Sequence, residues 1–291
     1  MIKVILQGGL GNQMFEYAAV YSLAHKRDLP FALDMSFMDV FGRKPWCRPY
    51  ELSVFALQQS AVFSHDYRLR VRLLPSLRRW CRQQGRHSIG RYVFEMSDLQ
   101  DPPLSDSLVL FDYFANYHLF EDYREDLLRA FAYALPPDSA NLALLNEMNQ
   151  SNSVAVHIRR GDYLSDAYKN VFFHPSVQWY RKAMDEIEKS VRKPRYYFFS
   201  DDIQWVKEQF KDVTNAVFVD INHGKDSYND MRLMSSCKHN IIANSSFSWW
   251  GAWLNPNKEK IVIAPSKYYM DEARAEEYRK KMIPKYWITI E

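Results

Sequence analysis

VAVHIRRGDY, residues 154–163, is the stretch that decides the fold. Its first five residues form a short apolar run around His157, as in a buried strand, and Gly161 then permits a tight turn. Because side chains alternate along a strand, His157 and Arg159 are expected to point to the same side. Ligands of open α/β sheets bind beyond the carboxyl ends of the strands. His157, Arg159 and Arg160 are therefore predicted to line a ligand site.

The two arginines suit an anionic ligand. A guanidinium group offers a rigid fork of donors that fits two phosphate oxygens, and its charge does not titrate near neutral pH. Asp162 can hold one of them by a salt bridge. The alternative is an arginine–aspartate pair that only fixes a loop, because such surface pairs are common and contribute little. The spacing alone leaves both interpretations open.

The chain on either side alternates between strands and helices, the pattern that builds parallel sheets. In the C-terminal half, strands are expected at 196–200, 216–219, 240–243 and 260–264, with helices at 177–192, 203–211, 227–238 and 269–281. The N-terminal half opens with a strand at 1–6, a glycine turn, a helix at 12–26 and a strand at 30–34.

A polar seam at 146–153 separates these two halves. We therefore predict two α/β domains, 1–150 and 151–291, that face a ligand cleft, the first on the acceptor side and the second holding the nucleotide. The charged helix at the C-terminus could pack back on the first domain.

NSSFSWWG, residues 244–251, follows a second strand directly. Ser245, Ser246 or Ser248 could cap the helix that begins there, and the free N–H groups of a helix start form an anion site. Ser245, Ser246 and Phe247 are therefore candidate donor-site residues. Simple capping with a buried tryptophan pair is the alternative, and it explains the tryptophans well.

GGLGNQ, residues 8–13, opens the first half and invites a dinucleotide-binding interpretation. The G-x-G-x-x-G pattern fails, because Met14 occupies the position of the third glycine, although Asp34 lies about 20 residues on, where a ribose-binding acid would be. A loop whose backbone approaches a phosphate fits better, with Asn12 and Gln13 as donors.

Three aspartates follow other expected strands. Asp220 ends the strand at 216–219, where its carboxylate could accept from the two N–H groups that guanine presents and adenine does not. A helix or turn cap is the alternative for Asp220. Asp201 and Asp202 follow the strand at 196–200 and are expected to cap the next helix.

The motifs that the sequence lacks narrow the chemistry. It has no DxD triplet, no HExxH and no P-loop, so bound phosphates would be neutralised by arginines and backbone N–H groups without a metal. Three cysteines without a CxxC pair favour a reducing compartment. A net charge of +3 does not favour a nucleic-acid binder. With no signal peptide and no run of about 20 apolar residues, a cytoplasmic bacterial protein is expected.

The stretch Arg68–Arg91 concentrates arginines between apolar residues. It could face an anionic membrane, an acidic acceptor or a partner, which would place the protein at the inner face of the membrane. A solvated helix face is the interpretation that the pattern favours.

Three stretches together resemble the bacterial α-1,2-fucosyltransferases of glycosyltransferase family 11. They are GGLGNQMFEYA (8–18), HIRRGDY (157–163) and DMRLMSSCKHNIIANSSFSWWGAWL (230–254), and they span most of the chain in the family's order. The HxRRxD part is shared more distantly with α-1,6- and protein O-fucosyltransferases. The resemblance implies a GT-B-type fold, two Rossmann-like domains facing a cleft.

The same resemblance implies an activity and its site. The donor would be GDP-β-L-fucose, the acceptor the 2-hydroxyl of a β-galactoside, and the transfer would invert the anomeric centre without a metal ion or cofactor. Carried over by position, the donor contacts are Arg159 for the diphosphate, His157 for the nucleotide, Asp220 for guanine, Ser246 and Phe247 for the β-phosphate, and Asn12 from the other domain.

The general base is the least defined part of this expectation. The α-1,6 relatives carry a glutamate several positions after the arginine motif, whereas this chain has Ala167 near there. Asp162 and Glu16 are the candidates, and reaction with little base assistance is an alternative. A transferase for another sugar nucleotide and a non-catalytic glycan-binding protein are the competing functions.

Overall fold

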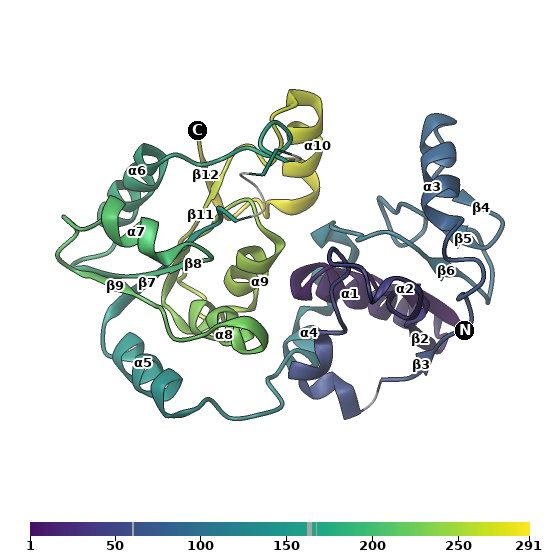
Figure 1. Cartoon of the computed structure of the whole chain (residues 1–291), viewed down its shortest axis with the longest axis horizontal. Helices are drawn as coiled ribbons and strands as arrows, with labels where there is room; N and C mark the ends of the chain where they lie inside the picture. The colour runs from purple at the N-terminus through teal and green to yellow at the C-terminus, as the bar shows by residue number, and fades with distance from the viewer. Residues whose placement is uncertain (60, 162–164, 167) are drawn as a thin grey trace. The chain divides into compact units, whose positions relative to one another are not determined.

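The computed structural model describes residues 1–59, 61–161, 165–166 and 168–291. The chain divides into two compact units, Met1–Leu135 and Pro136–Glu291 (Figure 1). This division lies before helix α5 (Ser139–Asn149), whereas the predicted boundary follows residue 150. Helix α5 packs on β7 and α8 of the second unit, which explains the earlier division. In the part of the chain that the structure describes, no helix has the length and apolar content to span a membrane.

The second unit is built on a six-stranded, wholly parallel sheet. Its strands lie in the order β12-β11-β10-β7-β8-β9. Their bounds are β7 Asn152–Ile158, β8 Pro194–Ser200, β9 Ala216–Phe218, β10 His239–Ile241, β11 Val262–Pro265 and β12 Ile288–Ile290. The helices are α5, α6 (Val177–Glu188), α7 (Ile203–Gln209), α8 (Tyr228–Ser236), α9 (Ser246–Leu254) and α10 (Glu272–Met282), with a 3₁₀ turn at Gly224–Asp226.

This strand order is that of the Rossmann fold. The chain adds strands on one side of β7 and then on the other, so the strand order reverses between β7 and β10. All the strands predicted in this half are present, and the expected β/α alternation is confirmed. The last strand, β12, was not predicted, because its residues Ile288–Ile290 are short and follow a polar segment. It pairs with β11 and ends the sheet.

The core of the second unit lies on both faces of this sheet. Val154, Val156 and Ile158 of β7 point to one face, where they pack with aromatic and aliphatic residues of α6, β8 and α7. On α9, the rings of Trp249 and Trp250 are buried and meet edge to face, 5.0 Å apart. The core role considered for these tryptophans is therefore correct.

The first unit carries a second six-stranded sheet, in the order β3-β2-β1-β6-β5-β4, parallel except for the β4–β5 pair. Its strands are β1 Ile2–Ile5, β2 Phe31–Asp34, β3 Phe63–Ser64, β4 Ser88–Ile89, β5 Tyr92–Val93 and β6 Val109–Leu110. Its helices are α1 (Leu10–Arg27), α2 (Ser36–Phe41), α3 (Leu74–Gln83) and α4 (Arg124–Ala130). Short 3₁₀ turns lie at Leu52–Val54, Ala56–Gln59, Tyr117–Leu119 and Glu121–Tyr123. The glycine turn at 8–11 follows β1. The strand order of this sheet reverses there too, between β1 and β6.

Candidate active site

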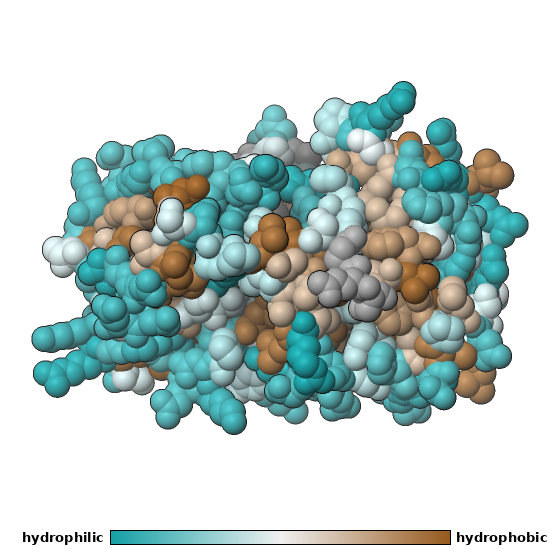
Figure 2. All heavy atoms as spheres, turned by 90° about the horizontal axis from the view of Figure 1, so that it is seen from below, coloured by the Kyte–Doolittle hydropathy of each residue, from teal (hydrophilic) through white to brown (hydrophobic). Residues whose placement is uncertain are grey.

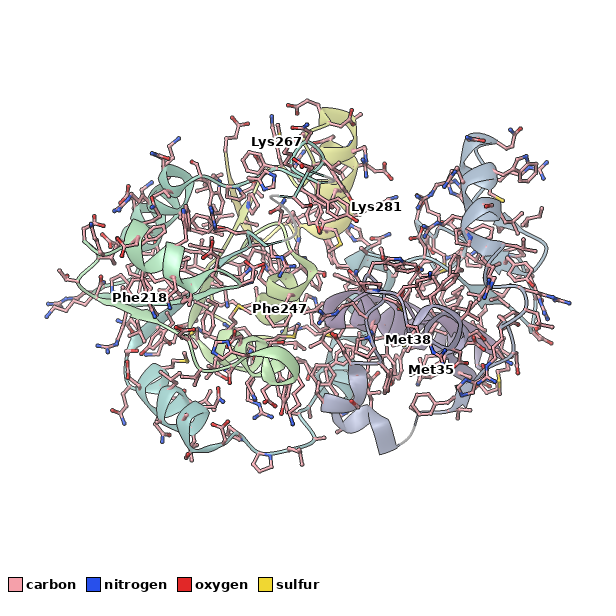
Figure 3. The ribbon with its side chains drawn as sticks, in the orientation of Figure 1. Met35, Met38, Phe218, Phe247, Lys267 and Lys281 are labelled. Carbon is pink, nitrogen blue, oxygen red and sulfur yellow. The ribbon has the colours of Figure 1, made fainter. Side chains whose placement is uncertain are left out.

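The carboxyl ends of β7 and β10 meet at the reversal point of the second sheet. The two strands are hydrogen-bonded neighbours, with Val156 beside Ile241. The rings of His157, near the end of β7, and Phe247, at the start of α9, lie 6.0 Å apart between centroids. Phe247 is labelled in Figure 3. Two of the predicted motifs, far apart in sequence, therefore converge where this fold binds its ligands.

Arg159 leaves β7 on this edge and is oriented by Asp201. Its Nη1 lies 3.0 Å from Asp201 Oδ2, and its side chain is 33% exposed. The other oxygen, Oδ1, accepts the backbone N–H of Arg160 at 2.9 Å. A Cβ on Gly161 would lie 2.3 Å from Asp201 Oδ2, so any other residue here would displace the carboxylate that holds Arg159. Asp201 thus fixes the arginine motif from the neighbouring strand.

The two aspartates after β8 have different roles, which the sequence did not separate. Asp202 caps α7, accepting the N–H of Trp205 at 3.3 Å, as predicted. Asp201 is not the cap residue, and its grip on Arg159 was missed. The parallel register offers a signal for it: Ile158 pairs with Ser200, so the residues that follow each of them lie side by side.

Arg160 makes two internal contacts. Its guanidinium lies 3.6 Å from the ring centroid of Trp205, and its Nε donates to Asp202 Oδ2 at 3.1 Å. Stacking of this kind anchors the side chain on α7. The predicted donor contact of Arg160 competes with these interactions.

His157 is buried, and its Nδ1 has no hydrogen-bond partner among the described residues. Burial, with a smaller contribution from the Arg159 charge, lowers the pKa of His157 to about 3. The imidazole is therefore neutral at physiological pH. A buried, unsatisfied ring nitrogen is unusual and marks a position where a ligand group can bind.

The start of α9 presents open backbone donors. The side chain of Ser245, the N-cap residue, makes no capping hydrogen bond. Ser248 Oγ bonds back to the carbonyls of Ala243 and Ser245, both at 3.3 Å. Within the described chain, no hydrogen bond takes the N–H of Ser246 or of Phe247. These groups are free to bind an anion, as the sequence predicts, and the anion site stays a prediction.

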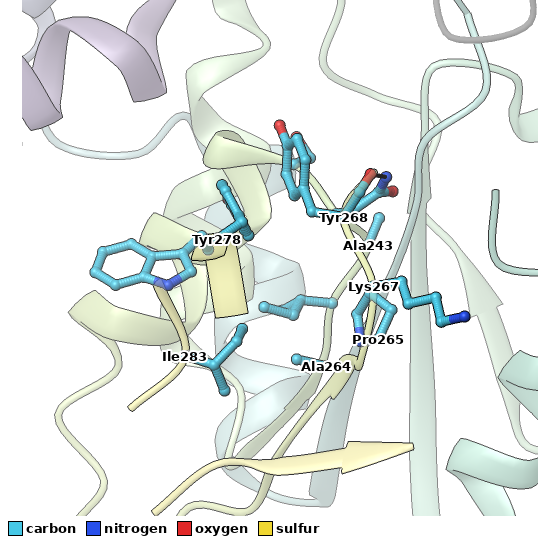
Figure 4. Close-up of a pocket in the computed structure, with 11 residues that line it drawn as sticks. Ala243, Ala264, Pro265, Lys267, Tyr268, Tyr278 and Ile283 are labelled. Carbon is cyan, nitrogen blue, oxygen red and sulfur yellow. Dashed lines mark hydrogen bonds between the residues drawn. The ribbon is translucent and has the colours of Figure 1, made fainter. Parts of the chain in front are cut away.

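A small pocket lies beside this helix start. Ala243, Asn244, Pro265 and Tyr268 help to line it (Figure 4). Its volume of about 10 Å³ accommodates roughly one water molecule. It is too small for a nucleotide or a sugar. Asn244 closes this region by donating from Nδ2 to the carbonyls of Phe173 (2.6 Å) and Tyr268 (3.0 Å).

Two carboxyl groups lie near the end of β9. The predicted guanine reader, Asp220, accepts from Lys207 Nζ at 2.9 Å and from Gln204 Nε2 at 3.1 Å, both on α7. Asp230, which the sequence analysis did not single out, is half-buried on α8 and accepts from Asn222 Nδ2 at 2.8 Å. Burial raises the pKa of Asp230 to about 7. Its position near Asp220, rather than its pKa, makes Asp230 a second candidate for contacting a base.

Asp162, the first candidate base, lies outside the described residues. No group of three His, Cys, Asp or Glu side chains that could hold a metal ion occurs among the residues that the structure places.

In the first unit, the glycine turn is shaped for close approach. Gly8 has φ +71°, and a Cβ there would lie 2.7 Å from Asn12 Nδ2 and 3.0 Å from the Tyr113 ring. The Asn12 amide makes no hydrogen bond within the described residues and is half-buried. It is the residue of this loop whose side chain suits a ligand contact.

Gln13, which was predicted to contact the donor, is engaged in hydrogen bonds within the first unit. Its Nε2 donates to the carbonyls of Gly8 and Pro49, each at 2.8 Å, and its Oε1 accepts the N–H of Glu51 at 2.9 Å. The amide is buried and engaged by these internal bonds, so direct donor binding by Gln13 does not fit. Gln13 instead ties the glycine turn to residues 49–51.

Glu16, the second candidate base, lies in the interior of the first unit. Its carboxyl is fully buried on α1, where Oε2 accepts the N–H of Gln7 at 3.0 Å. Burial raises the pKa of Glu16 well above its ordinary value. A buried carboxyl that holds its proton is poorly suited to take one from an acceptor hydroxyl, so burial counts against Glu16 as the general base, and the assignment stays a prediction.

Comparison with known proteins identifies the family of this chain. A model of glycosyl transferase family 11 matches residues 107–291. The O-antigen biosynthesis glycosyltransferase WbnK of Escherichia coli is 31% identical, over 91% of this chain and 93% of that protein. An α-1,2-colitosyltransferase of Escherichia coli is 28% identical, over 98% and 97%. A galactoside 2-α-L-fucosyltransferase of Bos taurus, SEC1, is 26% identical, over 85% and 62%.

Among solved structures, the fucosyltransferase NodZ from Bradyrhizobium has the same fold. The TM-score is 0.53 at 13% identity, over 86% of this chain and 91% of that one. NodZ co-crystallized with GDP gives 0.52, with the same identity and coverage. The predicted GT-B-type α/β fold is confirmed.

Proposed function

Because this chain belongs to glycosyltransferase family 11, we propose that it transfers L-fucose from GDP-β-L-fucose to the 2-hydroxyl of a terminal β-galactoside. The chain is a fucosyltransferase-like glycosyltransferase. The observation that carries the proposal is the convergence of His157, Arg159 and Phe247 at the reversal point of the second sheet.

The donor's diphosphate suits the groups at this edge. Arg159 supplies a fixed positive charge, and the start of α9 supplies the N–H groups of Ser246 and Phe247. His157 offers a neutral ring nitrogen to the nucleotide. Asp220 or Asp230 would accept the two N–H groups of guanine, and Asn12 stays the predicted donor contact of the glycine turn.

An inverting transfer is a single in-line displacement at the anomeric carbon. The acceptor oxygen forms a bond to this carbon as the bond to the β-phosphate oxygen breaks, and the acceptor proton leaves with a base or solvent. Negative charge then grows on GDP. Donors held in advance at that position stabilise the transition state by several kcal/mol. Arg159 and the α9 N–H groups can do this without a metal ion.

The Asp201 contact adds preorganisation to this step. Arg159 has four rotatable side-chain bonds, and an ion pair restricts them before the donor arrives. Less side-chain entropy is then lost when the guanidinium is ordered in the transition state. Asp162 remains the proposed base, since Glu16 is buried.

GDP-colitose is a second candidate donor, because a relative at 28% identity is named as an α-1,2-colitosyltransferase. Colitose differs from fucose by one missing hydroxyl. A site that hydrogen-bonds this hydroxyl would reject colitose, whereas a site that does not bond it would accept both.

The experiment that tests the proposal measures donor binding and transfer separately. GDP should raise the melting temperature and UDP should not; an equal response to both counts against guanine reading. GDP release from GDP-fucose and GDP-colitose is then followed across galactoside acceptors, with the linkage of the product assigned by NMR. Activity should survive chelation by EDTA. Loss of turnover in EDTA that magnesium restores would refute the metal-free mechanism, and a product linkage other than α-1,2 would refute the assigned reaction.

A further inference from the structure

Helix α3 and the turn before it carry a surface that the proposed reaction does not use. Three large apolar side chains are exposed there: Leu69 at 94%, Leu73 at 68% and Trp80 at 42%. Apolar residues are also exposed among polar ones on the face of the molecule that Figure 2 draws. Single exposed leucines are ordinary. Three large exposed apolar side chains that lie within 12 residues of one another, among arginines, form a mixed apolar and basic patch.

The fold of α3 explains why these groups face outward. Leu74 and Cys81 of α3 are buried against the first sheet, with Leu77 partly buried beside them. These positions recur at helical spacing and form the buried face of α3. Leu73 and Trp80 lie two turns apart on another face, about 10 Å from each other along the axis.

The charge around the patch is strongly positive. Residues 66–91 contain eight arginines and one carboxylate, Asp66, which gives +8 − 1 = +7 with neutral histidines. Asp39 pairs with Arg68, and Asp112 with Arg78 and Arg82.

The other arginines lack such partners. Among the described residues no carboxylate lies within ion-pair distance of Arg70, Arg72, Arg79, Arg86 or Arg91. The Arg86 guanidinium lies 6.0 Å from the ring centroid of Trp80, so a cation and an apolar group belong to one surface.

We propose that Leu69, Leu73 and Trp80, with Arg72, Arg79 and Arg86, form a docking surface for an anionic phospholipid bilayer. Arginines attract the surface of such a bilayer, leucines enter the boundary of its acyl chains, and a tryptophan ring settles at the headgroup level. A polyanion without an apolar phase would satisfy the arginines and leave the leucines in water. The combination therefore favours a lipid surface, and a soluble transferase would work there as a peripheral protein.

The test uses the full chain and lipid vesicles. Flotation with vesicles of equimolar phosphatidylglycerol and phosphatidylcholine should carry the protein upward, and pure phosphatidylcholine vesicles should not. Replacing Arg72, Arg79 and Arg86 by glutamine should weaken binding about a hundredfold, at roughly fivefold for each arginine near an anionic surface. Raising the salt concentration should weaken the wild type as well.

Leu69→Ser with Leu73→Ser tests the apolar part. Binding should fall roughly tenfold or more for each leucine that inserts. Serine at position 73 is a favourable N-cap for α3, so folding is expected to survive. Matched controls remove two exposed leucines elsewhere, Leu104→Ser with Leu135→Ser.

The matched charge control is a triple glutamine variant of the exposed Lys182, Lys211 and Lys258. Neither control should change vesicle binding by more than about twofold, since each replaces exposed leucines or lysines that lie outside the patch. Transfer to a soluble acceptor should remain at the wild-type rate in every patch variant, so a failure here is distinct from failure of the proposed function.

Three results would overturn the proposal. They are absence of binding to anionic vesicles, equal binding by the patch variants and the wild type, and equal loss in the lysine control. Concentration-dependent dimers that the leucine variants abolish would assign the surface to a second copy of this chain instead.

Discussion

Removal of Arg159 should separate catalysis from stability. The Arg159 guanidinium pairs with Asp201 at 3.0 Å, but a third of its side chain is exposed. Ion pairs at such partly exposed sites contribute about 0–1 kcal/mol to folding. Loss of one preorganised donor to a developing negative charge costs about 10²–10³-fold in rate, or roughly 2.7–4 kcal/mol. Arg159→Ala should therefore lower kcat/KM far more than it lowers stability.

The assay combines three measurements on each variant. They are the melting temperature, the Kd for GDP by calorimetry, and kcat/KM for GDP-fucose. A loss of 1 kcal/mol in a unit of this size shifts the melting temperature by about 2–4 °C, which sets the upper limit expected for Arg159→Ala. Arg159→Lys keeps the charge but loses the fork, so an intermediate rate is expected.

Arg181 provides the matched control. It also pairs with an aspartate, Asp212, at 2.8 Å, and its side chain is 39% exposed, but it lies on α6 away from the strand ends. Arg181→Ala should leave kcat/KM within about twofold while removing an ion pair of similar worth. If Arg159→Ala binds GDP and turns over as well as Arg181→Ala does, the assignment of Arg159 to the diphosphate is wrong.

Three further outcomes are expected. Because the folded pKa of Asp230 lies near 7, above its ordinary value, the contribution of Asp230 to stability should be complete below about pH 4 and fall by at most about 1.4 kcal/mol per unit as the pH rises to 7; the difference between wild type and Asp230→Asn in urea unfolding should follow this slope. Gly8→Ala should cost about 1–3 kcal/mol in thermal unfolding and displace Asn12, and it should cost more than Gly85→Ala, where φ is +64° but nothing lies within 4 Å. Glu16→Gln should keep kcat/KM within about tenfold, whereas a loss of 10²–10⁴-fold would restore Glu16 as the base.

The sequence predicts the second unit well because its strands are short apolar runs separated by amphipathic helices. The run at 154–158 lies within β7, and the predicted strand at 196–200 lies within β8. Strand order is less accessible, since apolar spacing does not say which strands are neighbours. Right-handed crossovers restrict the choices without reducing them to one.

Local sequence patterns predict only part of the candidate site. The start of α9 could be recognised, because its signal lies within a few residues. The role of Gln13 could not, since two of its three partners lie 36 and 38 positions away, at Pro49 and Glu51. The burial of Glu16 was also hidden, because a carboxylate on an amphipathic helix is usually on the solvent side.

The two arginines of the motif show how strand geometry, rather than charge, assigns their roles. Alternation places Arg160 on the side of Ile158, whose core cluster includes Trp205, and the guanidinium accordingly stacks on that ring. Arg159 lies on the side of His157, whose ring meets Phe247 at the start of α9. Each arginine pairs with one of the two aspartates that follow β8. Because Arg160 is held against Trp205, we do not expect it to substitute for Arg159.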